Sequence, residues 1–399
     1  MSATTTSSGT PAKAPDTRGL AGQTVGDTAI CAVTQTQLIY RGYEIADLAE
    51  HATFEEVAFL LLEGHKPSAA ELARFKAEIV SMRAIPEGLK ALLREIVTKA
   101  PRTHPMSVLR TGISYLSHFD PECEDHSPAA ELRKSKRLLA QIPTIIGHGQ
   151  MVLDGKTPVE PDASLSHSAN LLWCVTGRKP TELQARVMDV SLILYAEHDF
   201  NASTFACRVI ASTETDMHSA VCGGIGALKG PLHGGANEMA MEMLKDLDRD
   251  LAASKGAMNV EQWMQRAFAE KRKLMGFGHR VYKNGDHRAG ILRSWGLRLA
   301  KEQAAASGAG AADGPTKWFD LGDKVQAIML REKNIHPNVD FPCGMTYFVM
   351  GIPVPQYTPI FVASRITGWC AHIMEQRQNN RIIRPLADYV GPALKPWRG

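Results

Sequence analysis

Three short stretches of this chain each combine one ionisable side chain with residues that permit unusual backbone conformations. They are PLHGGAN around His233, GFGHR around His279 and PNVDF around Asp340. Two histidines and one carboxylate are sufficient for acid–base chemistry at a carbon atom. The three stretches are far apart in the sequence, so only the fold can bring them together.

The glycines before His233 do not form a phosphate-binding loop. Gly224, Gly226 and Gly230 are spaced GxGxxxG instead of GxGxxG, and no strand clearly precedes them. Gly234 and Gly235 would instead let the backbone approach a ligand beside His233. A tight turn with an incidental histidine is the alternative.

The stretch GFGHRVYKNGDHR is a dense basic loop. It contains His279, Arg280, Lys283, His287 and Arg288. Such a loop can hold phosphates or carboxylates through charge-assisted hydrogen bonds. A solvated basic loop is the alternative, and the glycines on both sides of His279 favour the functional interpretation.

Polar side chains crowd the end of an apolar helix that reaches Ala196. They are Glu197, His198, Asp199, Asn201, Ser203 and Thr204. So many polar groups beside an apolar helix require protein partners or a ligand. A satisfied polar network is the alternative.

An arginine also interrupts an apolar helical segment near the C-terminus. Phe361, Arg365 and Trp369 share one helix face. A buried arginine is costly unless it meets a carboxylate, which would belong either to the protein or to a ligand. Arg384, in the sequence IIRP, has a similar apolar setting.

We expect no metal at the histidines. His198, His218, His233 and His279 include no HExxH or HxH spacing.

The elements that must position these groups are mostly helices. Capping boxes pair Thr53 with Glu56, Ser68 with Glu71 and Thr181 with Gln184. Thr358 followed by Pro359 predicts another helix start, and Gly64 predicts a helix end. A short hairpin is expected within residues 30–40. Residues 234–333 are richer in methionine and charge than their flanks and include the loop GAGAADG at 308–314, which favours a smaller domain inserted into a larger one.

Composition restricts the function classes further. The net charge of +3 does not indicate nucleic-acid or membrane binding by bulk charge, and no run of 18 apolar residues occurs. Seven scattered cysteines favour reduced thiols in a cytoplasmic protein. Residues 1–18 are rich in Ser, Thr and Pro and predict a disordered tail, with a transit peptide as the weaker alternative.

The motifs together resemble the citrate synthase family, including 2-methylcitrate synthases. The resemblance extends from RGLAG at residue 18 to YVGP at 389–392 and includes YRGYEIADLA, AEHDFNASTF, GALKGPLHGGANE, GFGHRVYK and PNVDF. It implies a mostly α, two-domain helical fold. The large domain would comprise residues 19–233 and 334–399, and the small domain, on the acyl-CoA side, residues 234–333.

The resemblance also implies a reaction: condensation of an acyl-CoA with oxaloacetate, followed by thioester hydrolysis, without a permanently bound cofactor. Asp340 resembles the base that removes the acyl α-proton. His233 resembles the group that stabilises the enol or enolate oxygen. His279 resembles the acid that protonates the oxaloacetate carbonyl.

Binding positions follow from the same resemblance. Those implied for oxaloacetate are His198, Asn201, Arg288, Phe361, Arg365 and Arg384, the last reaching across a homodimer interface. Those implied for coenzyme A are Lys273, Leu274, Met275, Gly276, Phe277 and Lys283.

The acyl chain is left open between two and three carbons. Acetyl-CoA, giving citrate, is the first interpretation, and propionyl-CoA, giving 2-methylcitrate, is the alternative, because one methylene changes binding by only about 1–3 kcal/mol. Departures at Asp286-His287-Arg288 and Pro342-Cys343-Gly344 bear on acyl preference and coenzyme A affinity. A non-catalytic paralogue that senses coenzyme A or a dicarboxylate is a distant alternative, since His233, His279 and Asp340 are all present.

Overall fold

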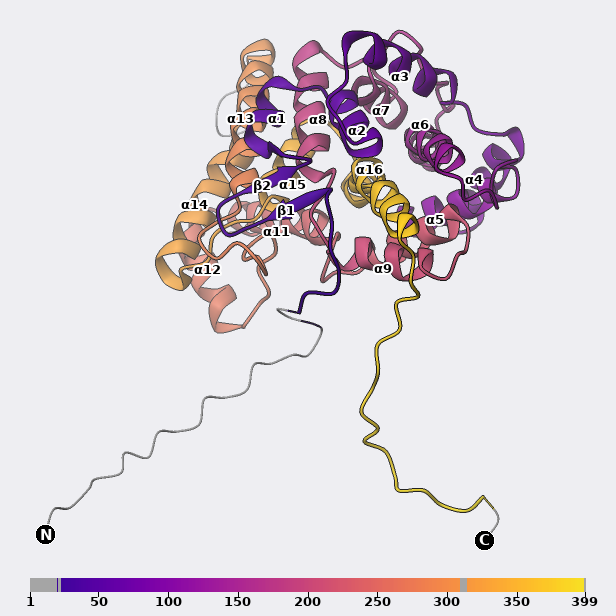
Figure 1. Ribbon diagram of the computed structural model, residues 1–399. Helices are drawn as coiled ribbons and strands as arrows, with labels where there is room; N and C mark the ends of the chain where they lie inside the picture. The colour runs from indigo at the N-terminus through magenta and orange to yellow at the C-terminus, as the bar shows by residue number, and fades with distance from the viewer. Residues whose placement is uncertain (1–19, 21–22, 309–313, 398–399) are drawn as a thin grey trace, which may run out of the picture.

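The computed structural model describes residues 20, 23–308 and 314–397, and within them the chain is mostly helical, as predicted (Figure 1). The tail at 1–18 and most of the loop at 308–314 lie outside the described residues. The expected hairpin is present as an antiparallel sheet of order β1-β2-β3. Its strands are β1 (Cys31–Val33), β2 (Leu38–Tyr40) and β3 (Tyr43–Glu44).

The first ten helices follow the sheet. They are α1 (Ile45–His51), α2 (Phe54–Glu63), α3 (Ala69–Ser81), α4 (Glu87–Lys99), α5 (Pro105–Ser117), α6 (Pro128–Leu153), α7 (His167–Thr176), α8 (Glu182–Tyr195), α9 (Ala202–Ala211) and α10 (Met217–Leu228). The remainder are α11 (Ala236–Ala253), α12 (Val260–Ala269), α13 (His287–Ser307), α14 (Lys317–Lys333), α15 (Asp340–Val349), the 3-10 turn η2 (Val354–Gln356) and α16 (Tyr357–Gln378).

The predicted helix boundaries are confirmed with one exception. All three capping boxes form, and Gly64 ends α2 in a left-handed conformation. The predicted N-cap at Thr358 is wrong, because α16 begins at Tyr357 directly after η2. The Thr358 side chain instead bonds the Glu238 carboxylate, a contact from α11 that local sequence does not reveal.

Helices α1 to α10 and α16 form the larger of two groups of helices, and α16 is its central element. It is buried along nearly its whole length and packs against α2, α6, α8, α9 and α10. A helix that is enclosed on all sides must be apolar around its whole circumference. Arg365, in the middle of this helix, therefore lies inside the protein.

A second group of helices lies beside the first in Figure 1. Helices α11, α12, α13 and α14 contact one another or α15, and α13 also packs on α8. The end of α8, the start of α15 and the middle of α16 consequently meet where the two groups join. No described helix is long and apolar enough to span a membrane.

Candidate active site

Asp340 is the first residue of α15 and lies against the last residue of α8. The Tyr195 hydroxyl donates a 2.7 Å hydrogen bond to Asp340 Oδ1. Asn338 accepts the Asp340 backbone N–H and so holds the start of α15. Burial raises the pKa of Asp340 to about 6, although the bond from Tyr195 acts in the opposite direction. A carboxyl with such a pKa is suited to general base catalysis near neutral pH.

Asp286 connects the start of α13 to the start of α15. Its two oxygens accept bonds of 2.9 and 2.8 Å from Arg288 Nε and Nη2. Oδ2 also accepts the Val339 N–H at 3.0 Å. The pair is almost fully buried, so its mutual hydrogen bonds are needed to offset the loss of hydration. Arg288 is thereby fixed near the residue that precedes Asp340.

The loop that follows His279 determines which nitrogen of its ring carries the proton. The backbone N–H groups of Val281 and Tyr282 both donate to His279 Nδ1, at 3.1 and 3.2 Å. A nitrogen that accepts these bonds carries no proton, so the neutral ring is protonated on Nε2. Burial, followed by the charge of Arg288, lowers the pKa of His279 to about 4. His279 is therefore a neutral hydrogen-bond donor at pH 7.

His198 lies beside His279, with ring centroids 5.2 Å apart. Its Nε2 is 3.0 Å from the Tyr282 hydroxyl. Burial lowers the pKa of His198 well below its usual value, and the neighbouring Arg288 adds to the effect. The polar residues after α8 thus include a second neutral imidazole.

His233 is oriented by the first turn of α9. The Ser203 backbone N–H donates to His233 Nε2 at 3.3 Å, and the Ser203 hydroxyl lies 2.8 Å from the same nitrogen. The neutral ring therefore carries its proton on Nδ1. Burial, followed by the charge of Arg365, lowers the pKa of His233 to about 4. Phe361 lies between His233 and Tyr195, with ring centroid distances of 6.4 and 4.3 Å.

Arg365 is fully buried without a carboxylate partner among the described residues. Its Nε donates to the Tyr195 carbonyl at 2.7 Å, and its guanidinium stacks over Phe361. Nη1 is buried and has no hydrogen-bond partner. The structural Arg–carboxylate pair, one of the two alternatives for this residue, is thus absent from the described part of the chain. An unpaired buried donor of this kind is suited to an anionic ligand.

The segment that precedes His279 is attached to the segment that precedes Asp340. Gly278 N–H donates to the His336 carbonyl, and Asn338 N–H donates to the Gly276 carbonyl. Gly276 has φ +83°, and a Cβ there would lie 3.0 Å from Phe341 Cα. Only glycine satisfies both conditions without displacement. Lys273 and Lys283 are exposed at the two ends of this region.

The structure brings most of the predicted site residues together. Tyr282 links one set of these residues by direct contacts: His198, His279 and Arg288. Tyr195 links a second set in the same way: His233, through Phe361, and Arg365 and Asp340. Asn201 caps α9 next to them. Arg384 is not at the site of its own chain, because it lies exposed on a C-terminal segment that extends from the body (Figure 1).

Several residues that hold these groups are not among the site residues predicted from the sequence. Tyr195 makes supporting contacts and lies outside the quoted stretches around His233, His279 and Asp340. Tyr282 and Asn338 lie inside GFGHRVYK and PNVDF, and Ser203 and Asp286 are marked as polar, but the sequence assigns none of the four a supporting role. Tyr195 looks like the last apolar residue of a buried helix. Its position directly before the polar cluster that begins at Glu197 is the one signal that could mark it.

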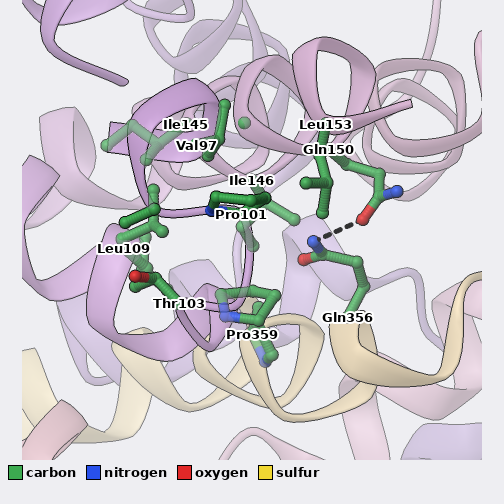
Figure 2. A pocket seen from close by; sticks show the side chains of 14 residues that line it. Val97, Pro101, Thr103, Leu109, Ile145, Ile146, Gln150, Leu153, Gln356 and Pro359 are labelled. Atoms are coloured by element: carbon green, nitrogen blue, oxygen red, sulfur yellow. Dashed lines mark hydrogen bonds between the residues drawn. The ribbon is translucent and has the colours of Figure 1, made fainter. Parts of the chain in front are cut away.

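An apolar pocket elsewhere in the larger group has no part in this arrangement (Figure 2). Side chains such as Val97, Leu109 and Ile146 line it, and one edge carries the 2.7 Å bond from Gln356 to Gln150. None of the predicted site residues lines this pocket. Its lining lacks ionisable groups and offers no acid–base chemistry.

The chain is similar to known proteins over nearly its whole length. A family model described as citrate synthase, C-terminal domain, matches residues 19–386. A 2-methylcitrate synthase of Shewanella oneidensis is 44% identical, over 94% of each chain. A citrate synthase of Mycolicibacterium smegmatis is 42% identical over 94% of this chain and 95% of its own.

Solved structures that this chain resembles include citrate synthases. One from Pyrobaculum aerophilum has a TM-score of 0.83 at 33% identity and covers all of this chain and 98% of its own. One from Thermoplasma acidophilum, in a ternary complex with carboxymethyl coenzyme A and oxaloacetate, has a TM-score of 0.85 at 28% identity and covers 96% and 97% of the two chains. The chain belongs to the citrate synthase family.

Proposed function

We propose that this enzyme condenses a short acyl-CoA with oxaloacetate and then hydrolyses the thioester, releasing coenzyme A and a tricarboxylate. The observation that carries the proposal is the buried Asp340 carboxylate, whose pKa of about 6 and bond to Tyr195 suit it to remove a proton from carbon. The S. oneidensis and M. smegmatis relatives support the same reaction type.

Asp340 would take the α-proton of the acyl group as the enol or enolate forms. The thioester oxygen then gains negative charge, and a neutral donor aimed at it lowers the barrier. His233 is assigned that role because its proton is on Nδ1 while Ser203 occupies Nε2. The new carbon–carbon bond places charge on the oxaloacetate carbonyl oxygen. His279 would donate its Nε2 proton to that oxygen.

Oxaloacetate would bind between Arg365 and Arg288, beside His198. The unpaired Nη1 of Arg365 supports a direct contact with a carboxylate. Phe361 would form one wall, and Asn201 would hold the loop after α8 in place, because it caps α9 and its Nδ2 bonds the His198 carbonyl. The T. acidophilum citrate synthase was solved in complex with oxaloacetate, which is in accord with such a site.

Coenzyme A would lie along residues 273–277, with the Lys283 cation available to a phosphate. The attachment of Gly276 and Gly278 to residues 336–338 supports this, since it brings that segment next to Asp340. In the same proposal, residues 234–333 form the small domain, with residues 19–233 and 334–399 as the large one. Closure of the two would exclude water during condensation.

A homodimer would complete the site with Arg384. The C-terminal segment after α16 is exposed, including Leu386, Tyr389 and Trp397. Apolar side chains at such exposure favour burial against a second copy of the chain. We also propose a cytoplasmic location, which the seven free cysteines support.

Acetyl-CoA is the first acyl substrate and propionyl-CoA the second, the latter favoured specifically by the 44% identical relative. The deciding experiment compares initial rates of coenzyme A release with each acyl-CoA at saturating oxaloacetate. A higher kcat/KM for acetyl-CoA supports citrate formation. A higher kcat/KM for propionyl-CoA would instead support formation of 2-methylcitrate.

A further inference from the structure

Three side chains with metal-binding atoms meet away from the active site. Cys123 lies in the connection between α5 and α6, while Asp216 and His218 lie at the start of α10. One ligand atom from each lies within 4.8 Å of the other two. Asp216 Oδ1 accepts the Ser219 N–H at 2.8 Å, so its carboxylate is already oriented as the helix cap.

His218 supplies an independent observation that points to a ligand. The residue is 2% exposed, and its Nδ1 is buried without a hydrogen-bond partner. That nitrogen lies 3.8 Å from Asp216 Oδ1, so it faces the cluster. An unpaired buried ring nitrogen is destabilising, and a ligand at that position would remove the penalty.

A carboxylate lies near the opposite side of the ring. Nε2 of His218 faces Asp120 Oδ2 at 3.6 Å. Arg137 holds Asp120 through bonds of 2.7 and 3.1 Å. This carboxylate is within ion-pair distance but beyond hydrogen-bond distance, and metal-bound histidines commonly donate their second ring N–H to a group of this kind.

The charge around Cys123 favours a cation. The carboxylates of Asp216, Glu124 and Asp120 and the single ammonium of Lys134 act on this thiol, so three negative charges face one positive charge. The thiol is free. A divalent ion would meet a negative local potential there and could displace the thiol proton.

We propose that Cys123 Sγ, an Asp216 carboxylate oxygen and His218 Nδ1 bind a zinc-class divalent ion, with water in the fourth position. Thiolate, imidazole and carboxylate ligands together select Zn²⁺ over Mg²⁺ or Ca²⁺. The ion would join the α5–α6 connection to the start of α10 and stabilise the fold without entering the condensation chemistry. Cys123 is distant in sequence from the other two residues, so a search for local histidine spacing does not find the cluster.

Cobalt titration of the full-length chain after chelator treatment and dialysis tests the site. We expect one equivalent of Co²⁺ to produce a thiolate-to-cobalt charge-transfer band, which Zn²⁺ then removes. Cys123→Ser should abolish the band, and His218→Gln should weaken binding at least about tenfold. Cys222→Ser is the matched control, because Cys222 is the other partly exposed cysteine, and it should leave the band unchanged.

Stability provides a second measurement. Zn²⁺ should raise the Tm of the chelator-treated chain, and this shift should disappear in Cys123→Ser while coenzyme A release remains normal. Normal release shows that the variant folds. Absence of the charge-transfer band in the unmodified chain, or its persistence in Cys123→Ser, would overturn the proposal. If His218→Gln does not fold, Cys123→Ser still decides the matter.

Discussion

The Tyr195 hydroxyl donates a 2.7 Å hydrogen bond to Asp340 Oδ1, which joins the end of α8 to the start of α15. The same tyrosine holds Arg365 through its carbonyl and packs edge-on against Phe361. One residue thus contacts the assigned base and two groups assigned to oxaloacetate. We expect Tyr195 to act as a positioning residue for Asp340.

Tyr195→Phe should shift the pH dependence of the reaction. The hydrogen bond from Tyr195 favours the ionised carboxylate, so its loss should raise the pKa of Asp340 above about 6. Because only the ionised form is a base, the acid limb of kcat should move to higher pH. The aromatic ring and the carbonyl bond to Arg365 are retained, so the KM for oxaloacetate should change little. An unchanged acid limb of kcat would show that Tyr195 does not position Asp340.

Arg365→Met should separate binding from stability. Arg365 is buried without a carboxylate among the described residues, so an apolar replacement should leave the ligand-free Tm unchanged or raise it. Oxaloacetate binding should weaken by about 2–5 kcal/mol in calorimetry. Oxaloacetate should therefore no longer raise the Tm of this variant. A large loss of ligand-free stability would indicate that Arg365 has a structural partner instead.

Gly276→Ala should impair acyl-CoA use more than a matched change elsewhere. A Cβ at Gly276 would lie 3.0 Å from Phe341 Cα and 2.8 Å from its Cβ, at φ +83°. Gly256 has φ +88° but open space around it, so Gly256→Ala tests the backbone strain alone. That strain costs roughly 1 kcal/mol. We expect steady-state kinetics to show a raised KM for acyl-CoA in Gly276→Ala only, and equal KM values in the two variants would contradict the assignment of residues 273–277.

Subunit complementation tests the contribution of Arg384. Arg384→Ala and Asp340→Asn should each have low activity when assayed alone. After mixing under conditions that exchange subunits, about half of the dimers should be hybrids with one intact site, giving about a quarter of normal activity. Light scattering should show a dimer throughout. Mixtures that remain as inactive as their components would place Arg384 outside the partner's site.

Local features of this fold can be predicted well from the sequence. Helix caps at Thr53, Ser68 and Thr181 depend on neighbouring residues only, and all three are confirmed. The N-cap predicted at Thr358 is wrong, because the Thr358 hydroxyl donates a hydrogen bond to the Glu238 carboxylate of α11. Long-range packing decides such cases.

The candidate site divides in the same way. Ionisable residues beside glycine or proline, such as His233 and Asp340, are visible in the sequence. Their supporting partners are not, because Tyr195 has the character of a core residue and the peptide N–H of Ser203 has no side-chain signature. The choice between a protein carboxylate and a ligand for Arg365 requires its contacts in the folded chain.

The assignment of Asp340 as the base is decided by the initial rate of coenzyme A release in the unmodified chain and in Asp340→Asn, with and without oxaloacetate. Asn keeps the shape of Asp340 but cannot accept a proton. We predict release only when both acyl-CoA and oxaloacetate are present, a fall of about 10²–10⁴-fold in the variant, and unchanged oxaloacetate binding by calorimetry. Release without oxaloacetate, or near-normal turnover in Asp340→Asn, would show that the proposed condensation at Asp340 is wrong.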